Sequence, residues 1–362
     1  RYVMRNAELF SSAHGLMLSE ARPRVADDAG SNIAALLEDG GGGADHIALT
    51  DPPRHWDLRR VMNQEFVTAR MDALRPEMER CCDQLLDQIV AGEPMDWVKQ
   101  TAERLPLLVT SAVLGLPDDN TDDIRRWSEA MEVVLNPPSE EGMMEAFATF
   151  ASSGPYLKEQ FAERRSCPGR DMLTLLSVAE QKNAKISEAN ITSMAQSVIA
   201  GGFGTTSAAL AGFVALMAEH PDQLESLVAD RSLIPQAVEE VLRWVTPQRG
   251  MLRTVTQETE LRGHELLAGE HVYLLLDSAN RDEAAFKNPD VFDVTRKREQ
   301  PILSFGHGPH VCVAAPLARL EIQMLAERLI DRFPRWTLAG EPRRAWNAIR
   351  SSWAELPVVF SS

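Results

Sequence analysis

The chain has 362 residues, of which 44% are hydrophobic and 25% charged, and its formal net charge is −16. This composition is typical of a globular protein with a large core, and the acidic balance argues against a general nucleic-acid binder, which would need a basic surface. Its four cysteines (Cys81, Cys82, Cys167 and Cys312) form no CxxC pair. We therefore predict neither a disulfide framework nor a zinc site, and we expect a cytoplasmic protein.

Helical patterns dominate from the N-terminus onward. Asp51-Pro52-Pro53 is a helix-start signal, and a glycine run at 40–43 reads as a loop. Helices are predicted over 51–66, 71–90, 102–114, 119–135 and 140–165. Breaker signals at 136–138 and 152–155 bracket a helix that we expect to act as a lid.

The second half continues in the same way and then adds strands. Further helices are predicted over 187–220, 221–229, 233–244 and 314–333. Strands are predicted only in the last third, over 252–261, 271–276 and 356–360, with a turn at 262–264. The expected fold class is therefore mainly α.

One stretch needs a membrane check, because residues 191–218 carry no charge and are long enough to span a bilayer. The stretch also contains Gln196, several glycines and hydroxyl side chains, and it lacks a basic flank. A long helix buried through the centre of a large domain is the better interpretation. We expect no membrane anchor.

The most informative segment surrounds Cys312. It reads Phe-Gly-His-Gly-Pro-His-Val-Cys over 305–312, and a helical pattern follows at once. The glycines allow a close approach of the backbone to a flat partner, and the positive end of the following helix favours thiolate over thiol. A cysteine presented in this way is either a nucleophile or an axial metal ligand.

Three other segments carry chemistry. His55 and Arg59 are four residues apart and share a helix face, which suits either an anionic group or solvent. Glu240 and Arg243 form an ExxR pair that, by itself, is most often a surface salt bridge. Glycines at 201, 202 and 204 interrupt a helix, where they permit close packing, a kink or a groove over a flat cofactor.

Together these segments resemble the cytochrome P450 family. The loop at 305–312 with Leu-Ala-Arg-Leu-Glu after it is similar to that family's haem-binding signature, and 51–59 resembles its Asp-Pro-Pro-x-His-x-x-x-Arg helix. The resemblance implies a helical prism with small sheets and a buried haem b. It implies that Cys312 is the iron ligand, and that the other haem contacts are His55, Arg59, Arg253, Phe305, Gly306 and His310.

The resemblance also assigns residues away from the iron ligand. Glu240 and Arg243, with Arg296 as third partner, would hold the core around the haem loop as structural residues. Thr205, beside Gly204 and Thr206, matches the hydroxyl that guides protons to the oxygen substrate. Gly204 stands where the family places an acid, and this departure leaves the route of proton delivery open.

The implied activity is a monooxygenase that uses O2 to hydroxylate or otherwise oxidise a hydrophobic small molecule such as a steroid, lipid, terpenoid or polyketide. Two alternatives remain: an atypical haem-thiolate enzyme (peroxygenase, oxidative coupling or nitration type), motivated by Gly204, and a non-catalytic haem-binding sensor. The expected substrate pocket comprises Ile199, Phe203, Val245, Met251 and Trp353.

The resemblance covers residues 10 to 362, and a single domain over 1–362 is expected that lacks the family's usual first helix and part of its first sheet. Electrons would come from NAD(P)H through a reductase and a ferredoxin or flavodoxin. A basic run at Arg296-Lys297-Arg298 is a candidate docking patch, despite the acidic total. The protein is expected to be a monomer.

Overall fold

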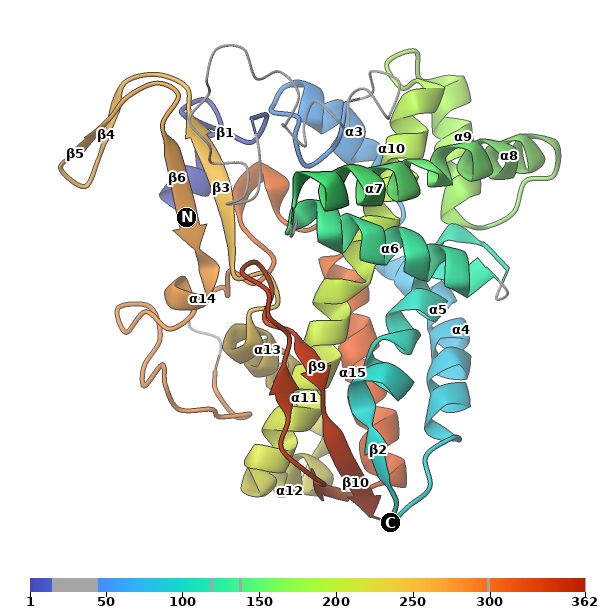
Figure 1. Cartoon of the computed structure of the whole chain (residues 1–362), viewed down its shortest axis with the longest axis vertical. Helices are drawn as coiled ribbons and strands as arrows, with labels where there is room; N and C mark the ends of the chain where they lie inside the picture. The colour runs from blue at the N-terminus through green and yellow to red at the C-terminus, as the bar shows by residue number, and fades with distance from the viewer. Residues whose placement is uncertain (15–44, 118–119, 137–138, 298–299, 362) are drawn as a thin grey trace.

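The computed structural model describes residues 1–14, 45–117, 120–136, 139–297 and 300–361. Helices make up most of this part, and the strands lie along one side and at the lower margin (Figure 1). The mainly α class expected from the sequence is confirmed. The glycine run at 40–43 lies outside the described residues.

Among the described residues, the first half of the chain is helical apart from two short strands. Its elements are α1 (Tyr2–Arg5), β1 (Phe10–Ser11), α3 (Arg54–Met62), α4 (Thr68–Leu86), β2 (Pro94–Asp96), the π-helical η2 (Val98–Ala102), α5 (Arg104–Leu114), α6 (Thr121–Leu135), α7 (Glu140–Ala151), α8 (Ser153–Ser166) and α9 (Met172–Lys182). The single helix predicted over 140–165 is thus two helices that meet at Ser152. Helix α9 was not predicted, although Asp171 caps it by accepting a hydrogen bond from the Thr174 amide at 2.7 Å.

The second half carries the core helices and most strands. Its elements are α10 (Glu188–Gly202), α11 (Gly204–Glu219), α12 (Pro221–Ala229), η4 (Arg231–Leu233), α13 (Ile234–Val245), β3 (Gly250–Val255), β4 (Thr259–Leu261), β5 (His264–Leu266), β6 (His271–Leu275), α14 (Leu276–Ala279), η5 (Gly308–His310), α15 (Ala315–Arg332), β7 (Arg335–Leu338), β8 (Arg343–Arg344), β9 (Trp353–Glu355) and β10 (Pro357–Ser361).

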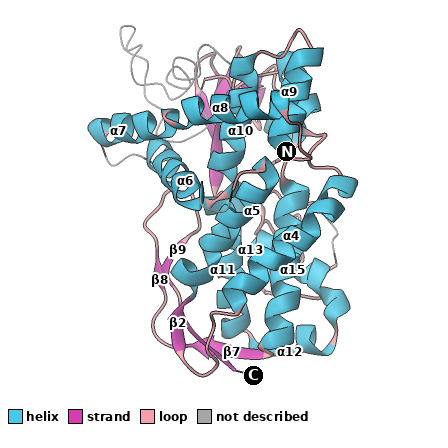
Figure 2. Cartoon of the chain, turned by 90° about the vertical axis from the view of Figure 1, so that its right-hand side faces the viewer, coloured by secondary structure: helices cyan, strands magenta, loops and turns pink. Residues whose placement is uncertain are grey.

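Helices α10 and α11 run through the middle of the molecule, roughly along its longest axis (Figures 1 and 2). A capping box between Ser187 and Asn190 starts α10. The sequence predicted one continuous helix, whereas the structure breaks it at Phe203, where glycines on both sides weaken the helical preference. Read as one helix, residues Glu188–Glu219 are long and apolar enough to cross a membrane, but 72% of the apolar window is buried inside the protein. This is the signature of a core helix.

The strands form small antiparallel sheets. One sheet has the order β1-β3-β6, a second has the order β2-β10-β7, and β4-β5 and β8-β9 are two-stranded. Strands β1 and β2 correct the prediction that strands occur only in the last third. Both are too short to show a period of two, and they owe their form to pairing with distant β3 and β10.

The predicted turn at 262–264 joins β4 and β5. Arg262 and Gly263 have φ values of 53° and 82°, as a two-residue type I′ hairpin turn requires. Helix α15 packs against α4, and Arg328 and Arg332 bridge to Asp83 at 2.9 and 2.7 Å. This helical framework holds the segment before α15, which contains Cys312.

Candidate active site

Cys312 lies at the end of a tight loop that leads into α15. Its amide donates to the Phe305 carbonyl at 2.8 Å, which closes the loop. Gly306 and Gly308 have φ values of 70° and 75°, in the left-handed region that glycine tolerates best. A Cβ on Gly308 would also collide with the backbone of Met4. The glycines of the motif are therefore required by geometry, and they leave Cys312 exposed to the cavity described below.

The charge state of the Cys312 thiol corrects one expectation. Burial raises its pKa, while the amides of Ala314 and Ala315 and the cations Arg59 and Arg319 only partly oppose this effect. The helix start therefore does not by itself produce a thiolate here. A bound metal ion removes this barrier, since a coordinating thiol loses its proton outright.

A cavity of about 390 Å³ opens over Cys312. Its wall contains most of the predicted site residues. They are His55, Arg59, Thr205, Thr206, Met251, Arg253, Phe305, Gly306, His310 and Cys312. Within the described part of the chain, no group of three or more His, Cys, Asp or Glu side chains could hold a metal ion. Any metal here would thus arrive with its own ligand set and take Cys312 as a single protein ligand.

Two arginines give the cavity a cationic side. Arg253 is 3% exposed, donates to the Leu252 carbonyl at 2.6 Å and forms no ion pair with the described residues. Burial lowers the pKa of Arg253 to about 10, with Asp51 as the opposing charge. Arg59 donates to the Val311 carbonyl and to Asn63 Oδ1. A buried guanidinium without a carboxylate partner is costly, so this donor set fits the propionate groups of a haem.

The two predicted histidine rings lie tilted against each other, and His55 is fully engaged, whereas buried His310 Nε2 has no hydrogen-bond partner among the described residues. Their ring centroids are 4.2 Å apart, and both nitrogens of His55 face carbonyls, those of Ile47 and Pro309, at 3.1 and 3.0 Å. Burial, with neighbouring His55, Arg253 and Arg59, lowers the pKa of His310 to about 3. A neutral His310 can offer a propionate a hydrogen bond but no charge.

Gly201 and Gly202 of α10 also line the cavity, and they fit two of the interpretations that the sequence left open, a groove and close packing. Nothing lies within 4 Å of a Cβ placed on Gly201, whereas a Cβ on Gly202 would be 2.8 Å from Thr110 Oγ1. Thr205 Oγ1 donates to the Gly201 carbonyl at 3.0 Å. Its lone pairs are left to accept hydrogen bonds in the cavity, as a group that passes protons must do.

Gly204 does not line the cavity. A Cβ on Gly204 would collide with the Glu132 carboxyl and the Arg350 guanidinium, which form an ion pair at that point. Sequence reasoning missed both residues. Glu132 lies four positions after buried Ser128, at the edge of the buried face of α6. This position is the only local sign in the sequence that its carboxylate faces the interior.

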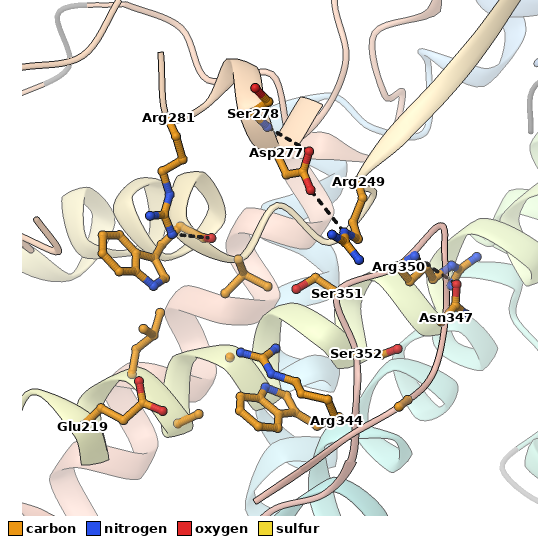
Figure 3. A pocket seen from close by; sticks show the side chains of 17 residues that line it. Glu219, Arg249, Asp277, Ser278, Arg281, Arg344, Asn347, Arg350, Ser351 and Ser352 are labelled. Atoms are coloured by element: carbon orange, nitrogen blue, oxygen red, sulfur yellow. Dashed lines mark hydrogen bonds and ion pairs between the residues drawn. The ribbon is translucent and has the colours of Figure 1, made fainter. Parts of the chain in front are cut away.

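Only one of the predicted pocket residues, Met251, lies on the cavity wall. Ile199 and Phe203 are packed into the core, where Ser128 donates to the Ile199 carbonyl at 3.0 Å. Val245 and Trp353 line a different, outer pocket, shown in Figure 3. For Ile199 and Phe203, the prediction failed because it took the sequence neighbours of a motif, whereas the helical period points these side chains away from the cavity.

The residues that do form the apolar wall are not themselves part of any motif. They are Ile47, Leu49, Met62, Val109, Met131, Leu135, Val198 and Ala209. His46 adds a polar group, with its Nε2 3.1 Å from Ser197 Oγ. Alternating apolar residues in α5 and α6 look like ordinary core positions in the sequence, so nothing local distinguished them.

Glu240, Arg243 and Arg296 lie together beneath the loop. Arg243 makes a bidentate pair with Glu240, with both contacts at 2.8 Å, and Arg296 Nε reaches Glu240 at 3.0 Å. Arg243 also donates to the carbonyls of Asn280 and Pro289 at 3.0 and 2.8 Å. Glu240 and Arg243 are 2% and 1% exposed, so this network is internal rather than a surface salt bridge.

Arg319, on the first turns of α15, stabilises the loop from the side. Its guanidinium carbon lies 4.4 Å from the centroid of the Phe305 ring, and the same side chain pairs with Glu239. The stacking fixes Phe305 at the cavity wall.

Comparisons with known proteins agree with this geometry. The cytochrome P450 family model matches residues 141–344. A steroid C26-monooxygenase of Mycolicibacterium smegmatis is 32% identical over 100% of this chain and 92% of its own length. The erythromycin C-12 hydroxylase of Saccharopolyspora erythraea is 35% identical over 86% of this chain and 79% of its own.

Solved structures are similar over the whole described fold. The epothilone D-bound cytochrome P450epoK superposes with a TM-score of 0.89 at 29% identity, covering 100% of this chain and 88% of that one. P450BioI in complex with a fatty-acyl carrier protein gives 0.87 at 28% identity, with 99% and 90% covered. The motif around Cys312, the cavity above it and these likenesses agree: the chain belongs to the cytochrome P450 family and is a monooxygenase.

Proposed function

We propose that this monooxygenase oxidises a large, mostly apolar molecule with few polar groups, of the steroid or macrolactone class. The observation that carries the proposal is the wall of the cavity above Cys312. Most of its side chains outside the haem contacts are aliphatic, and they come from the segment before α3 and from α3, α5, α6, α10 and α11. Apolar walls with a small number of placed polar groups select hydrophobic ligands and fix their orientation.

One polar pair supports substrate orientation. Burial lowers the pKa of His46 to about 4, so its ring is neutral at pH 7. His46 Nδ1 accepts from the Ala48 amide at 3.3 Å, which places the proton on Nε2, next to Ser197 Oγ. Since Ser197 donates to the Ser193 carbonyl at 2.7 Å, its remaining lone pair can accept from a substrate hydroxyl.

The chain's own residues have separate tasks in this reaction. When bound, haem supplies the activation of O2, with electron density from the thiolate favouring O–O cleavage. Arg253 and Arg59 on the cavity wall would pair with the propionates of the haem. Arg319 keeps Phe305 in place. Thr205 Oγ1 donates to the Gly201 carbonyl, so its lone pairs can accept a hydrogen bond from a water molecule at the break between α10 and α11.

We also propose that electrons arrive from NAD(P)H through a reductase and a ferredoxin or flavodoxin that docks beside the Cys312 loop. A shallow surface pocket there is lined by Trp56, Arg60 and Val311, among others. Arg60 is 74% exposed and Trp56 45%, a cation and an aromatic ring that suit an acidic partner. Arg296 is withdrawn from the docking patch expected from sequence, because it is engaged with Glu240, and position 298 lies outside the described residues.

The test is a spectral screen followed by product analysis. Purified haem-loaded protein is titrated with steroids, macrolactones and fatty acids, and a low-to-high-spin shift reports binding near the iron. Turnover under ¹⁸O2 with ferredoxin, reductase and NAD(P)H should place one labelled oxygen in the product of a steroid or macrolactone. Binding of fatty acids alone would contradict the substrate class. Turnover with peroxide but not with redox partners would contradict the electron route and favour a peroxygenase.

A further inference from the structure

The space beside Gly204 contains a carboxylate that comes from a distant part of the chain. Glu132 on α6 and Arg350, in the loop before β9, meet as an ion pair where a side chain at position 204 would lie. Gly204 has no side chain of its own, and any larger residue would displace the pair. The position in which the family places an acid is therefore filled by an acid from another helix.

The pair is largely withdrawn from water. The Arg350 side chain is 5% exposed and that of Glu132 is 21% exposed. Burial raises the pKa of Glu132, and the charge of Arg350 opposes this. Burial lowers the pKa of Arg350, and Glu132 opposes it. No other titratable group acts on either side chain to a resolved extent. A carboxyl whose pKa is raised by burial is a candidate to take up and release a proton.

Arg350 connects this carboxyl to two spaces. It lines the cavity above Cys312 and also an outer pocket of about 600 Å³. Figure 3 shows Arg350 at the edge of that pocket, near Asn347, Ser351 and Ser352, with Arg249 and Asp277 across from it. The Arg350 amide donates to Asn347 Oδ1 at 3.0 Å, which helps to fix this loop. The polar outer pocket offers water a way to the ion pair from outside.

We propose that Glu132 is the proton-relay acid of this enzyme, a role that the residue at position 204 would otherwise have. Its carboxylate takes a proton from water in the outer pocket and returns it to water beside Thr205, while Arg350 stays charged and holds the carboxylate in place. Two such transfers, with two electrons from the redox partner, balance the conversion of O2 and substrate into hydroxylated product and water. This inference rests on the proposed function, in which redox partners supply the electrons for oxygenation.

A purely structural role is the competing explanation, since the pair also ties α6 to the loop before β9. The two explanations differ in what a neutral isostere does. Glu132→Gln keeps the shape but cannot carry the proton, so a relay fails, whereas a clamp loses only stability. They differ again for a swap: Glu132→Ala/Gly204→Asp moves the carboxylate to α11, next to the space that Glu132 vacated and directly against the Arg350 guanidinium, which must shift to make room.

The experiment compares four haem-loaded proteins with wild type: Glu132→Gln, Glu132→Ala, the swap and Glu65→Gln. Glu65 is the matched control, because it is 5% exposed, has a pKa raised by burial, and pairs with Arg70 at 2.6 Å away from both pockets. The readouts are oxygenated product per electron consumed, the solvent deuterium effect on that ratio, the free energy of unfolding, and infrared titration of buried carboxyl groups in the resting protein.

We expect Glu132→Gln to lower product per electron by about tenfold or more, with the missing electrons recovered as hydrogen peroxide. The swap should restore most of the coupling that Glu132→Ala loses. Glu65→Gln should lose stability without any change in coupling. In the infrared titration, wild type should show a protonated-carboxyl band that Glu132→Gln lacks, in addition to those of buried Glu65 and Glu321, whose pKa values are also raised by burial.

Unchanged coupling in Glu132→Gln would overturn the proposal, and so would a folded swap variant as uncoupled as Glu132→Ala. Absence of the infrared band at every pH would also count against it. Failure of the proposed function looks different: wild type would give no oxygenated product with any redox pair, while the infrared titration would still report proton uptake by Glu132. Gly204→Asp alone should impair coupling, because it forces a second carboxylate against Glu132.

Discussion

At the scale of single residues, burial decides how the side chains around Cys312 behave. The motifs and the family resemblance they carry were enough to identify Cys312, Arg59, Arg253 and Thr205, which the structure places on one cavity. They could not give the charge states of these residues, which depend on how much water the fold removes from each group. Burial raises the pKa of Cys312 and lowers that of His310 to about 3. Neither shift has a signature in the sequence.

The first prediction concerns Arg253, a buried cation without an ion-pair partner in the described structure. Arg253→Met should raise the free energy of unfolding of haem-free protein by about 1–3 kcal/mol, because it removes an uncompensated buried charge. The same change should weaken haem retention, measured as the rate of haem transfer to apomyoglobin. A variant that destabilises the haem-free protein and keeps its haem normally would contradict the assignment to a propionate.

The second prediction concerns His46, whose pKa falls from 6.5 to about 4 on burial. His46 in the unfolded chain therefore takes up a proton near pH 6.5, whereas His46 in the folded protein is protonated only near pH 4. Stability contributed by the neutral ring is complete above pH 6.5 and is lost as pH falls toward 4. His46→Gln should lessen the loss of unfolding free energy in this window by up to about 1.4 kcal/mol per pH unit. Equal slopes in denaturant titrations of the two proteins at pH 7, 6 and 5 would contradict this.

At the scale of elements, start and stop signals located most helices, and distant partners explain the misses. Helix α12 was predicted with its exact bounds because Pro221 opens it and a turn follows. The break at Phe203 was not predicted, since a glycine-rich helix centre is compatible with packing, a kink or a groove. Strands β1 and β2 exist through pairing with β3 and β10, a cause that lies outside the local sequence.

The third prediction tests the Glu240 network that supports the Cys312 loop. Arg243→Met should lower the free energy of unfolding by about 3–5 kcal/mol, because it leaves Glu240 buried without its bidentate partner. Arg296→Met should cost less, since Arg243 still neutralises Glu240. Arg343→Met breaks the exposed pair with Glu355 and should cost less than about 1 kcal/mol. Equal losses in all three variants would argue against an internal network.

At the scale of the whole molecule, the family resemblance predicted the architecture, while the contacts specific to this chain came from the structure alone. Glu132, Gly204 and Arg350 are far apart in sequence, and their meeting depends on how α6, α11 and the loop before β9 pack together. The same holds for the aliphatic wall above Cys312. Motifs describe what the family shares, and packing describes what sets this chain apart.

The fourth prediction concerns redox partners of a protein whose formal net charge is −16. Arg60→Glu should slow reduction by an acidic ferredoxin about tenfold at low salt, with the difference shrinking as ionic strength rises, because exposed charges are screened. Arg343→Glu makes the same change of charge outside the shallow pocket and serves as control. If both variants slowed reduction equally, net charge rather than this pocket would set the rate.

The central claim is that Cys312 is the single protein ligand of a haem held in the cavity above it. The most direct measurement is the spectrum of the reduced, carbon monoxide-treated protein, for wild type and for Cys312→Ala reconstituted with haem. Wild type should show the red-shifted Soret band of thiolate ligation, and the variant should lack it. A variant that keeps the red-shifted band would contradict the account.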